Sequence, residues 1–186
     1  MEMKDLVQDE LENSKMVLDR TLDGLTPAEL KWQPHPDANS IGLILFHSIR
    51  SEDRLIHILQ SKPQLWESEN WYQKFNKKIE DGGAHYTVEQ VAAFVVPDLK
   101  DLLAYAEAVR KNTIEYLKGL KPKDFDKKGN LPPPPVPMAT PPASPTRPHP
   151  PFNPIVGSML MHELTELAGH AGEISYIRGL QRSMDR

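Results

Sequence analysis

The 186-residue chain contains no cysteine. This excludes thiol nucleophiles, disulfides and thiolate-ligated zinc, and it is compatible with a reducing compartment, so we expect a cytoplasmic protein. No run of about 18 uncharged apolar residues occurs, and no membrane-spanning helix is expected. The first residues also lack a basic segment followed by an apolar one, so we expect no secretory signal.

Excess basic charge is absent as well. The chain has 22 Lys and Arg against 26 Asp and Glu, a net charge of −4, and its basic residues form no stripe. Binding to nucleic acid or to an anionic membrane is therefore not expected, and a small-molecule substrate is the expected partner. The hydrophobic content of 39% and the charged content of 26% are typical of a soluble globular protein, and the length fits one domain over residues 1–186.

Four long segments carry apolar residues at helical spacing, with charged residues between them. They cover residues 4–24, 41–60, 98–118 and about 154–182. Capping boxes at Thr26–Glu29 and Thr87–Gln90 predict two further, short helices. Because no credible strand pattern appears, the chain is predicted to be an all-α four-helix bundle. The stretches 62–86 and 119–154 would then be long crossover connections.

Most of the 18 prolines of the chain lie between residues 131 and 154. No helix or central strand tolerates that density of proline, so an extended, polyproline-like loop insert is expected there. Such a loop serves most simply as a spacer before the last helix, although proline-rich segments also bind aromatic grooves of other proteins.

The last long helix carries His162, Glu166 and His170 at intervals of four residues. Residues four apart share a helix face, so Glu166 and His170 can reach one divalent ion, whose ligands lie about 2.0–2.2 Å away. The third ligand must come from another helix, and His47 is the best candidate. His162 is the second choice, because it lies about 12 Å from His170 along the helix axis.

Each of these residues also has a plainer interpretation. A lone histidine in an apolar run is usually a satisfied core residue, and a Glu–His pair is often a partly exposed hydrogen-bonded pair. Together, two histidines and one carboxylate leave coordination positions open, which is typical of a reactive metal rather than a structural one. Glu163 and Glu173 are expected to orient the ligands or to face solvent. The remaining histidines are expected on the surface: His35, His57, His85 and His149.

Two motifs together resemble those of the DinB-like superfamily, which includes bacillithiol and mycothiol transferases. They are Trp32-x-Pro34 followed by Asn39-Ser40-Ile41-Gly42-x-Ile44-x-Phe46-His47-Ser48-Ile49, and Glu166-x-x-x-His170-x-Gly172-Glu173-Ile174-x-x-x-Arg178. The resemblance implies a homodimeric four-helix bundle with zinc or nickel held by His47, Glu166 and His170. Many relatives have histidine where this chain has Glu166, which changes the charge of the site.

Three functions are compatible with these features. In the first, a metal-dependent enzyme activates a thiol or a water, as in a thiol S-transferase or a hydrolase. Without cysteine, such a thiol must belong to a low-molecular-weight cofactor. In the second, the chain is a non-catalytic metal- or ligand-binding stress-response module, with a pocket lined by Trp66, Trp71 and Tyr72. In the third, it is a metal-free scaffold, so the sequence leaves open whether the chain is an enzyme.

Overall fold

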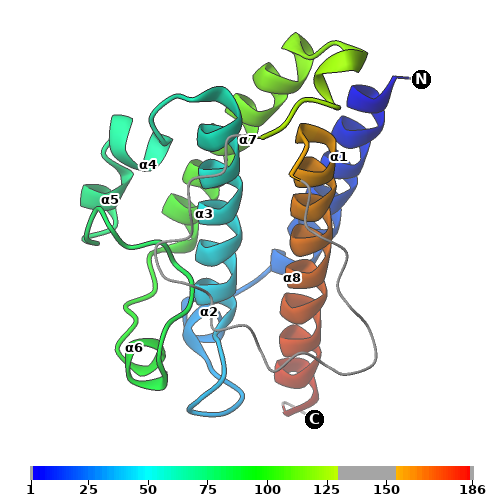
Figure 1. Ribbon diagram of the computed structural model, residues 1–186. Helices are drawn as coiled ribbons and strands as arrows, with labels where there is room; N and C mark the ends of the chain where they lie inside the picture. Colours follow the sequence, from blue (N-terminus) through cyan, green and yellow to red (C-terminus); the bar gives the residue numbers. More distant parts are fainter. Residues whose placement is uncertain (1, 130–153, 185–186) are drawn as a thin grey trace, which may run out of the picture.

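The computed structural model describes residues 2–129 and 154–184, and four long helices build it (Figure 1). They are α1 (Met3–Leu22), α3 (Ile41–Gln60), α7 (Leu99–Gly119) and α8 (Val156–Met184). The predicted all-α bundle is confirmed. The predicted proline-rich loop at 131–154 lies outside the described residues, apart from Pro154. Within the described ranges, no helix is long and apolar enough to span a membrane.

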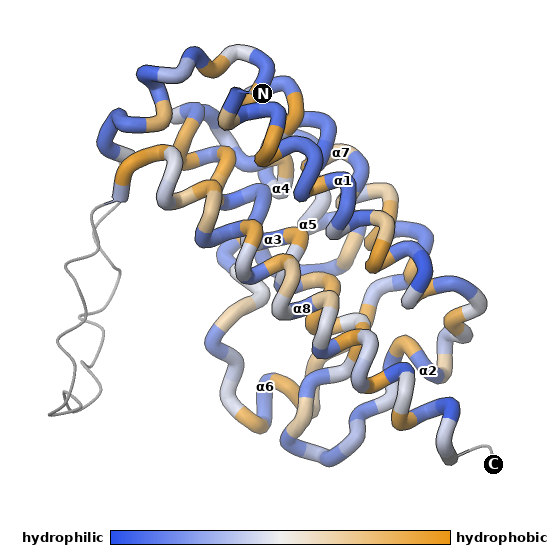
Figure 2. The backbone as a smooth tube through the Cα atoms, turned by 90° about the vertical axis from the view of Figure 1, so that its right-hand side faces the viewer, coloured by the Kyte–Doolittle hydropathy of each residue, from blue (hydrophilic) through white to orange (hydrophobic). Residues whose placement is uncertain are grey.

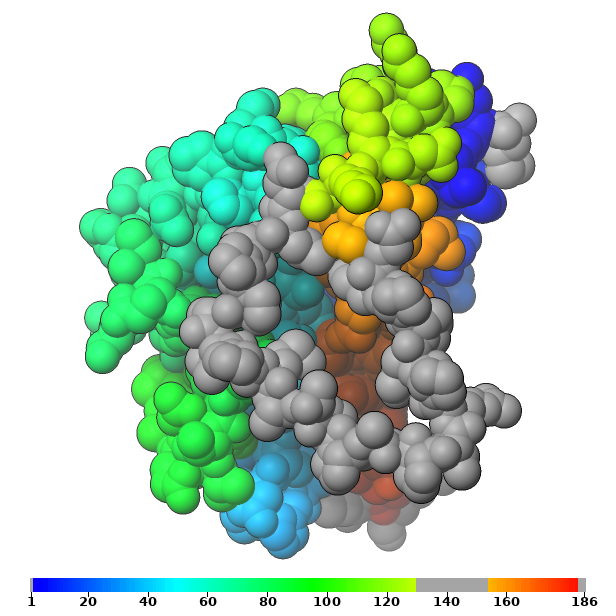
Figure 3. All heavy atoms as spheres, viewed as in Figure 1, coloured from blue at the N-terminus to red at the C-terminus, as the bar shows by residue number. Residues whose placement is uncertain are grey.

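The four helices run in two directions, with α1 and α8 opposite to α3 and α7 (Figure 1). Because α3 and α7 are parallel, the connection 61–98 must return along the bundle, and it forms one flank of the molecule (Figure 3). It contains α4 (Leu65–Ser68), α5 (Trp71–Lys74) and α6 (Val88–Ala92). Only α6 was predicted, because one-turn helices such as α4 and α5 are too short to show a period.

Local side-chain contacts set the helix starts. The Ser40 hydroxyl accepts a hydrogen bond from the Leu43 amide and caps α3. The capping boxes open α2 (Pro27–Lys31) at Thr26 and α6 at Thr87. The cap at Ser40 sets where α3 begins, and the first turns of this helix are almost wholly apolar and buried.

The core lies mainly between α3 and its neighbours, and the long helices show apolar stripes between polar faces (Figure 2). Ile41 and Phe46 are completely buried, which explains why the start of α3 is apolar on all sides. Trp66 and Trp71 belong to the same core, where Trp71 and Tyr105 have ring centroids 5.1 Å apart. The two tryptophans therefore pack in the core and do not line an open pocket.

One buried carboxylate ties the connection to α3 and α7. Asp53, with no exposed surface, accepts hydrogen bonds from the Tyr105 hydroxyl at 2.6 Å and from the backbone amides of Leu65 at 3.0 Å and Trp66 at 2.9 Å. The guanidinium of Arg50 lies 3.3 Å from the same carboxylate and stacks on the Trp66 ring at 4.3 Å. A buried charge with this many donors is stable only while all of them remain in place.

Replacing Asp53 by asparagine is expected to lower the free energy of unfolding by about 3 to 5 kcal/mol. The amide nitrogen would face a backbone N–H whichever way it turned, and Arg50 would lose its counter-charge. Chemical denaturation monitored by circular dichroism measures the effect. The control is Asp19→Asn in the exposed Lys15–Asp19 pair, which should cost less than about 1 kcal/mol. Equal losses in the two variants would contradict this role of Asp53.

Candidate metal centre

His47 on α3 faces Glu166 and His170 on α8. One potential ligand atom from each side chain lies within 4.8 Å of the other two. In the part of the chain that the structure describes, no other group of three or more His, Cys, Asp or Glu side chains converges in this way. The rings of the two histidines are perpendicular, with centroids 4.8 Å apart.

The orientation of His47 is set by the connection 61–98. Its Nδ1 donates a hydrogen bond to the Gly83 carbonyl oxygen at 2.9 Å, so the lone pair of the neutral ring is on Nε2. Gly83 has a φ of +70°, and a Cβ there would lie 3.0 Å from the Phe46 ring, so glycine is required. Burial, followed by the proximity of His170, lowers the pKa of His47. A neutral imidazole is the form that binds metal.

A carboxylate sets the orientation of His170 in the same way. Its Nδ1 lies 3.0 Å from a carboxylate oxygen of Glu173, which can only accept, so Nδ1 carries the proton. Its Nε2 is buried and has no hydrogen-bond partner among the described residues. The nearest carboxylate oxygen, on Glu166, is 3.7 Å from Nε2, beyond hydrogen-bonding distance. An unpaired buried acceptor is costly, and a metal ion would satisfy it.

The donor set fits a divalent cation in both type and spacing. Two imidazole nitrogens and one carboxylate oxygen are ligands for zinc or nickel. At bond lengths of about 2.1 Å, two ligand atoms of a tetrahedral site are roughly 3.4 Å apart. The observed 3.7 Å between the Glu166 carboxylate oxygen and Nε2 of His170 is close to this distance. All three ligand atoms lie within 4.8 Å of one another, so a small side-chain rotation would bring the more distant ones to the same ion. The Glu166 side chain is 42% exposed and has room to rotate.

The other sequence candidates lie elsewhere. His162, the second choice, is exposed and does not belong to the converging group. Glu173 orients His170, as expected for an outer carboxylate. His35 and His85 are exposed as predicted, whereas His57 is half-buried and hydrogen-bonds the Lys62 carbonyl. His149 lies outside the described residues.

Glu163 is not solvated, contrary to one of the two roles expected for it. It is 6% exposed, and one carboxylate oxygen accepts a hydrogen bond from the Ser51 hydroxyl at 3.1 Å, while the other has no partner in the part of the chain that the structure describes. Burial, reinforced by the nearby carboxylate of Glu52, raises the pKa of Glu163 to about 8. A protonatable acid thus lies one helical turn from Glu166. The spacing on α8 alone did not reveal this, because the burial depends on α3.

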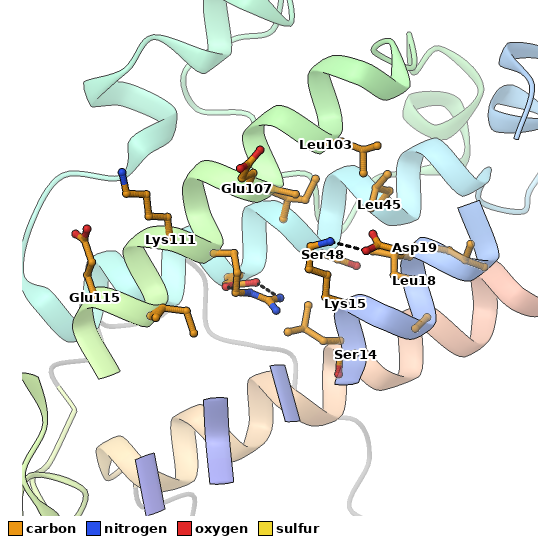
Figure 4. Close-up of a pocket in the computed structure, with 18 of the residues that line it drawn as sticks. Ser14, Lys15, Leu18, Asp19, Leu45, Ser48, Leu103, Glu107, Lys111 and Glu115 are labelled. Atoms are coloured by element: carbon orange, nitrogen blue, oxygen red, sulfur yellow. Dashed lines mark hydrogen bonds and ion pairs between the residues drawn. The ribbon is translucent and has the colours of Figure 1, made fainter. Parts of the chain in front are cut away.

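A cavity of about 630 Å³ lies between α1 and α7, with α3 and α8 as its floor (Figure 4). Its floor is mostly apolar, and its rim carries charges of both signs, such as the Lys15–Asp19 pair (Figure 4). It contains none of the three converging side chains. Their immediate neighbours Ser48, Leu167 and Ala171 line it instead, so it lies on the other face of the α3–α8 pair.

A family model described as the DinB superfamily matches residues 10–174. Among solved structures, a conserved protein from Enterococcus faecalis is similar, with a TM-score of 0.75 and 24% sequence identity, over 96% of each chain. At this identity the likeness shows the fold. No curated protein matches the chain.

The raised pKa of Glu163 gives a pH dependence that can be measured on metal-free protein. The folded state holds the proton between the ordinary value of 4.5 and about 8, whereas the unfolded state releases it. Folding stability from this group is therefore present below pH 4.5 and is lost as the pH rises toward 8. We expect Glu163→Gln to become more stable relative to the wild type across this range, by at most about 5 kcal/mol.

Denaturation curves at several pH values test this expectation, because the difference between variant and wild type removes the titration of the histidines. Ser183→Ala, an exposed site on the same helix, serves as the control and should follow the wild type at every pH. Parallel stability curves for Glu163→Gln and wild type would contradict the raised pKa.

Proposed function

The chain belongs to the DinB superfamily, and we propose that it is a divalent-metal-dependent enzyme whose metal ligands are His47, Glu166 and His170. The observation that carries this proposal is the buried, unpartnered Nε2 of His170, which faces the other two side chains. Two further contacts support it. The Gly83 carbonyl oxygen accepts a hydrogen bond from Nδ1 of His47, and the Glu173 carboxylate accepts one from Nδ1 of His170. Both imidazoles are thereby fixed with Nε2 available.

Zinc or nickel is the proposed ion, because both accept imidazole nitrogen together with one carboxylate. Three protein ligands leave at least one position for a substrate or for water, as in catalytic rather than structural sites. A bound divalent ion would make a coordinated thiol or water acidic enough to act as a nucleophile near neutral pH. The chain has no cysteine, so a thiol nucleophile would come from a low-molecular-weight thiol.

The residues around the site have separate roles in this proposal. Gly83 and Glu173 orient the two histidines and keep their lone pairs inward. Glu163, with a pKa of about 8, holds a proton near the site at neutral pH and can exchange it with a bound small molecule. The reaction is accordingly a transfer of a thiol to an electrophile or a hydrolysis. A homodimer and a cytoplasmic location remain predictions.

Protein purified without a polyhistidine tag should contain about one zinc or nickel ion per chain. Removing a ligand in His47→Ala or His170→Ala should weaken metal affinity by more than about 100-fold. Glu173→Gln, which removes only an orienting partner, should cost roughly 10- to 100-fold. Elemental analysis and competition with a chromophoric chelator measure both quantities.

The matched control is His162→Ala, a histidine on the same helix outside the converging group. This variant should retain its metal. If His162→Ala lost the metal and Glu166→Ala kept it, Glu166 would have been wrongly assigned as a ligand, and His162 would take its place. Full metal content in His47→Ala would contradict the proposed site.

Turnover separates an enzyme from a non-catalytic module. Metal-loaded protein should transfer a low-molecular-weight thiol to a model electrophile, or hydrolyse an activated ester, faster than metal-free protein does. Glu163→Gln should retain metal and lose the pH dependence of that rate near pH 8, because its proton cannot be released. Stoichiometric metal without turnover of either kind would instead favour a metal- or ligand-binding stress-response module.

A further inference from the structure

Arg54 is a half-buried arginine of α3. The other buried or half-buried arginines of the described ranges all bond a carboxylate: Arg50 with Asp53, Arg110 with Glu52, and Arg178 with Glu29. In residues 2–129 and 154–184, Arg54 makes no hydrogen bond and no ion pair. Its nitrogens are not closed off from solvent, unlike the Nε of Arg178. Its guanidinium is therefore accessible to a ligand.

The guanidinium lies beside the candidate metal centre. Arg54 follows His47 by two helical turns, so both side chains are on the same face of α3. A Cβ added to Gly82 would lie 3.2 Å from Nη1 of Arg54, so the guanidinium packs against Gly82. The next residue, Gly83, supplies the carbonyl that binds His47. The positive charge of Arg54 also lowers the pKa of His47, which agrees with this proximity.

Glu163 is a carboxyl group near Arg54, and the two side chains form no hydrogen bond and no ion pair. One oxygen of Glu163 is used by Ser51, and the other is buried and unpaired. Gly82 packs against one side of the guanidinium, and no described residue accepts a hydrogen bond from its N–H groups. A partly desolvated guanidinium with free donors is a favourable site for an anion.

We propose that Arg54 binds the carboxylate of the substrate, whose other end lies at the metal centre; this inference rests on the proposed metal site. The planar fork of N–H groups matches a carboxylate in two parallel hydrogen bonds. A phosphate dianion fits less well, because no second unpaired cation lies beside Arg54 in the described residues and the candidate centre already contains the carboxylate of Glu166. The substrate class is thus a small carboxylic acid.

Calorimetric titration with succinate, succinamide and inorganic phosphate tests this assignment on zinc-loaded and on metal-free protein. Succinate should bind both forms, and succinamide and phosphate should bind more weakly than succinate. Arg54→Met should weaken succinate binding by about 10- to 100-fold. Arg54→Lys should restore part of the affinity, since it retains the charge without the planar fork. Metal content should be unchanged in both variants.

Two further variants guard the interpretation. Arg20→Met removes an exposed arginine of α1 and should bind succinate as the wild type does. Gly82→Ala leaves the Arg54 side chain intact and should weaken binding less than Arg54→Met does, because its methyl group would shift the guanidinium by only a few tenths of an ångström. Equal succinate affinity in wild type and Arg54→Met, or tighter binding of phosphate or succinamide, would overturn the proposal. Failure to bind zinc would instead overturn the proposed metal site, because the metal-free titration tests Arg54 separately.

Discussion

The buried anion of Asp53 is the contact on which the rest of the molecule depends. It joins α3 to α7 through Tyr105 and to the connection 61–98 through two backbone amides. Its partner Arg50 reaches the Asp81 carbonyl at 3.4 Å, and the Asp81 side chain accepts the Gly83 amide at 3.1 Å. Gly83 in turn fixes His47. Consecutive hydrogen bonds through the connection 61–98 therefore link Asp53 to His47, which is one of the three converging side chains.

The candidate centre is prepared by hydrogen bonds to the nitrogens that would not bind a metal. A backbone carbonyl holds the Nδ1 of His47, and a carboxylate holds the Nδ1 of His170. The two histidines thus differ in what they require. The first depends on the fold of a distant loop, whereas the second depends only on a residue less than one helical turn away. Glu166 has no such partner and retains the freedom to adjust.

Periodicity and capping were sufficient to predict α1, α3, α7 and α8 within a few residues, because amphipathic stripes and caps are local properties. The pairing of Glu166 with His170 was predictable for the same reason, and His47 followed from the bundle topology. Features that depend on contacts between distant segments were missed. They include the hydrogen bond from His47 to the carbonyl of Gly83 and the burial of Glu163 against Ser51. The helices α4 and α5 were missed for a different reason, because each is too short to show a period.

The cavity between α1 and α7 and the candidate centre share the backbone of α3 and α8. His47 is followed by Ser48, Glu166 by Leu167, and His170 by Ala171, and in each pair the second residue lines the cavity. A small rotation of α8 about its own axis would therefore reshape both faces at once. Substitutions that fill the cavity from α3 or α8 would therefore act on the same backbone segments that carry the three donor side chains.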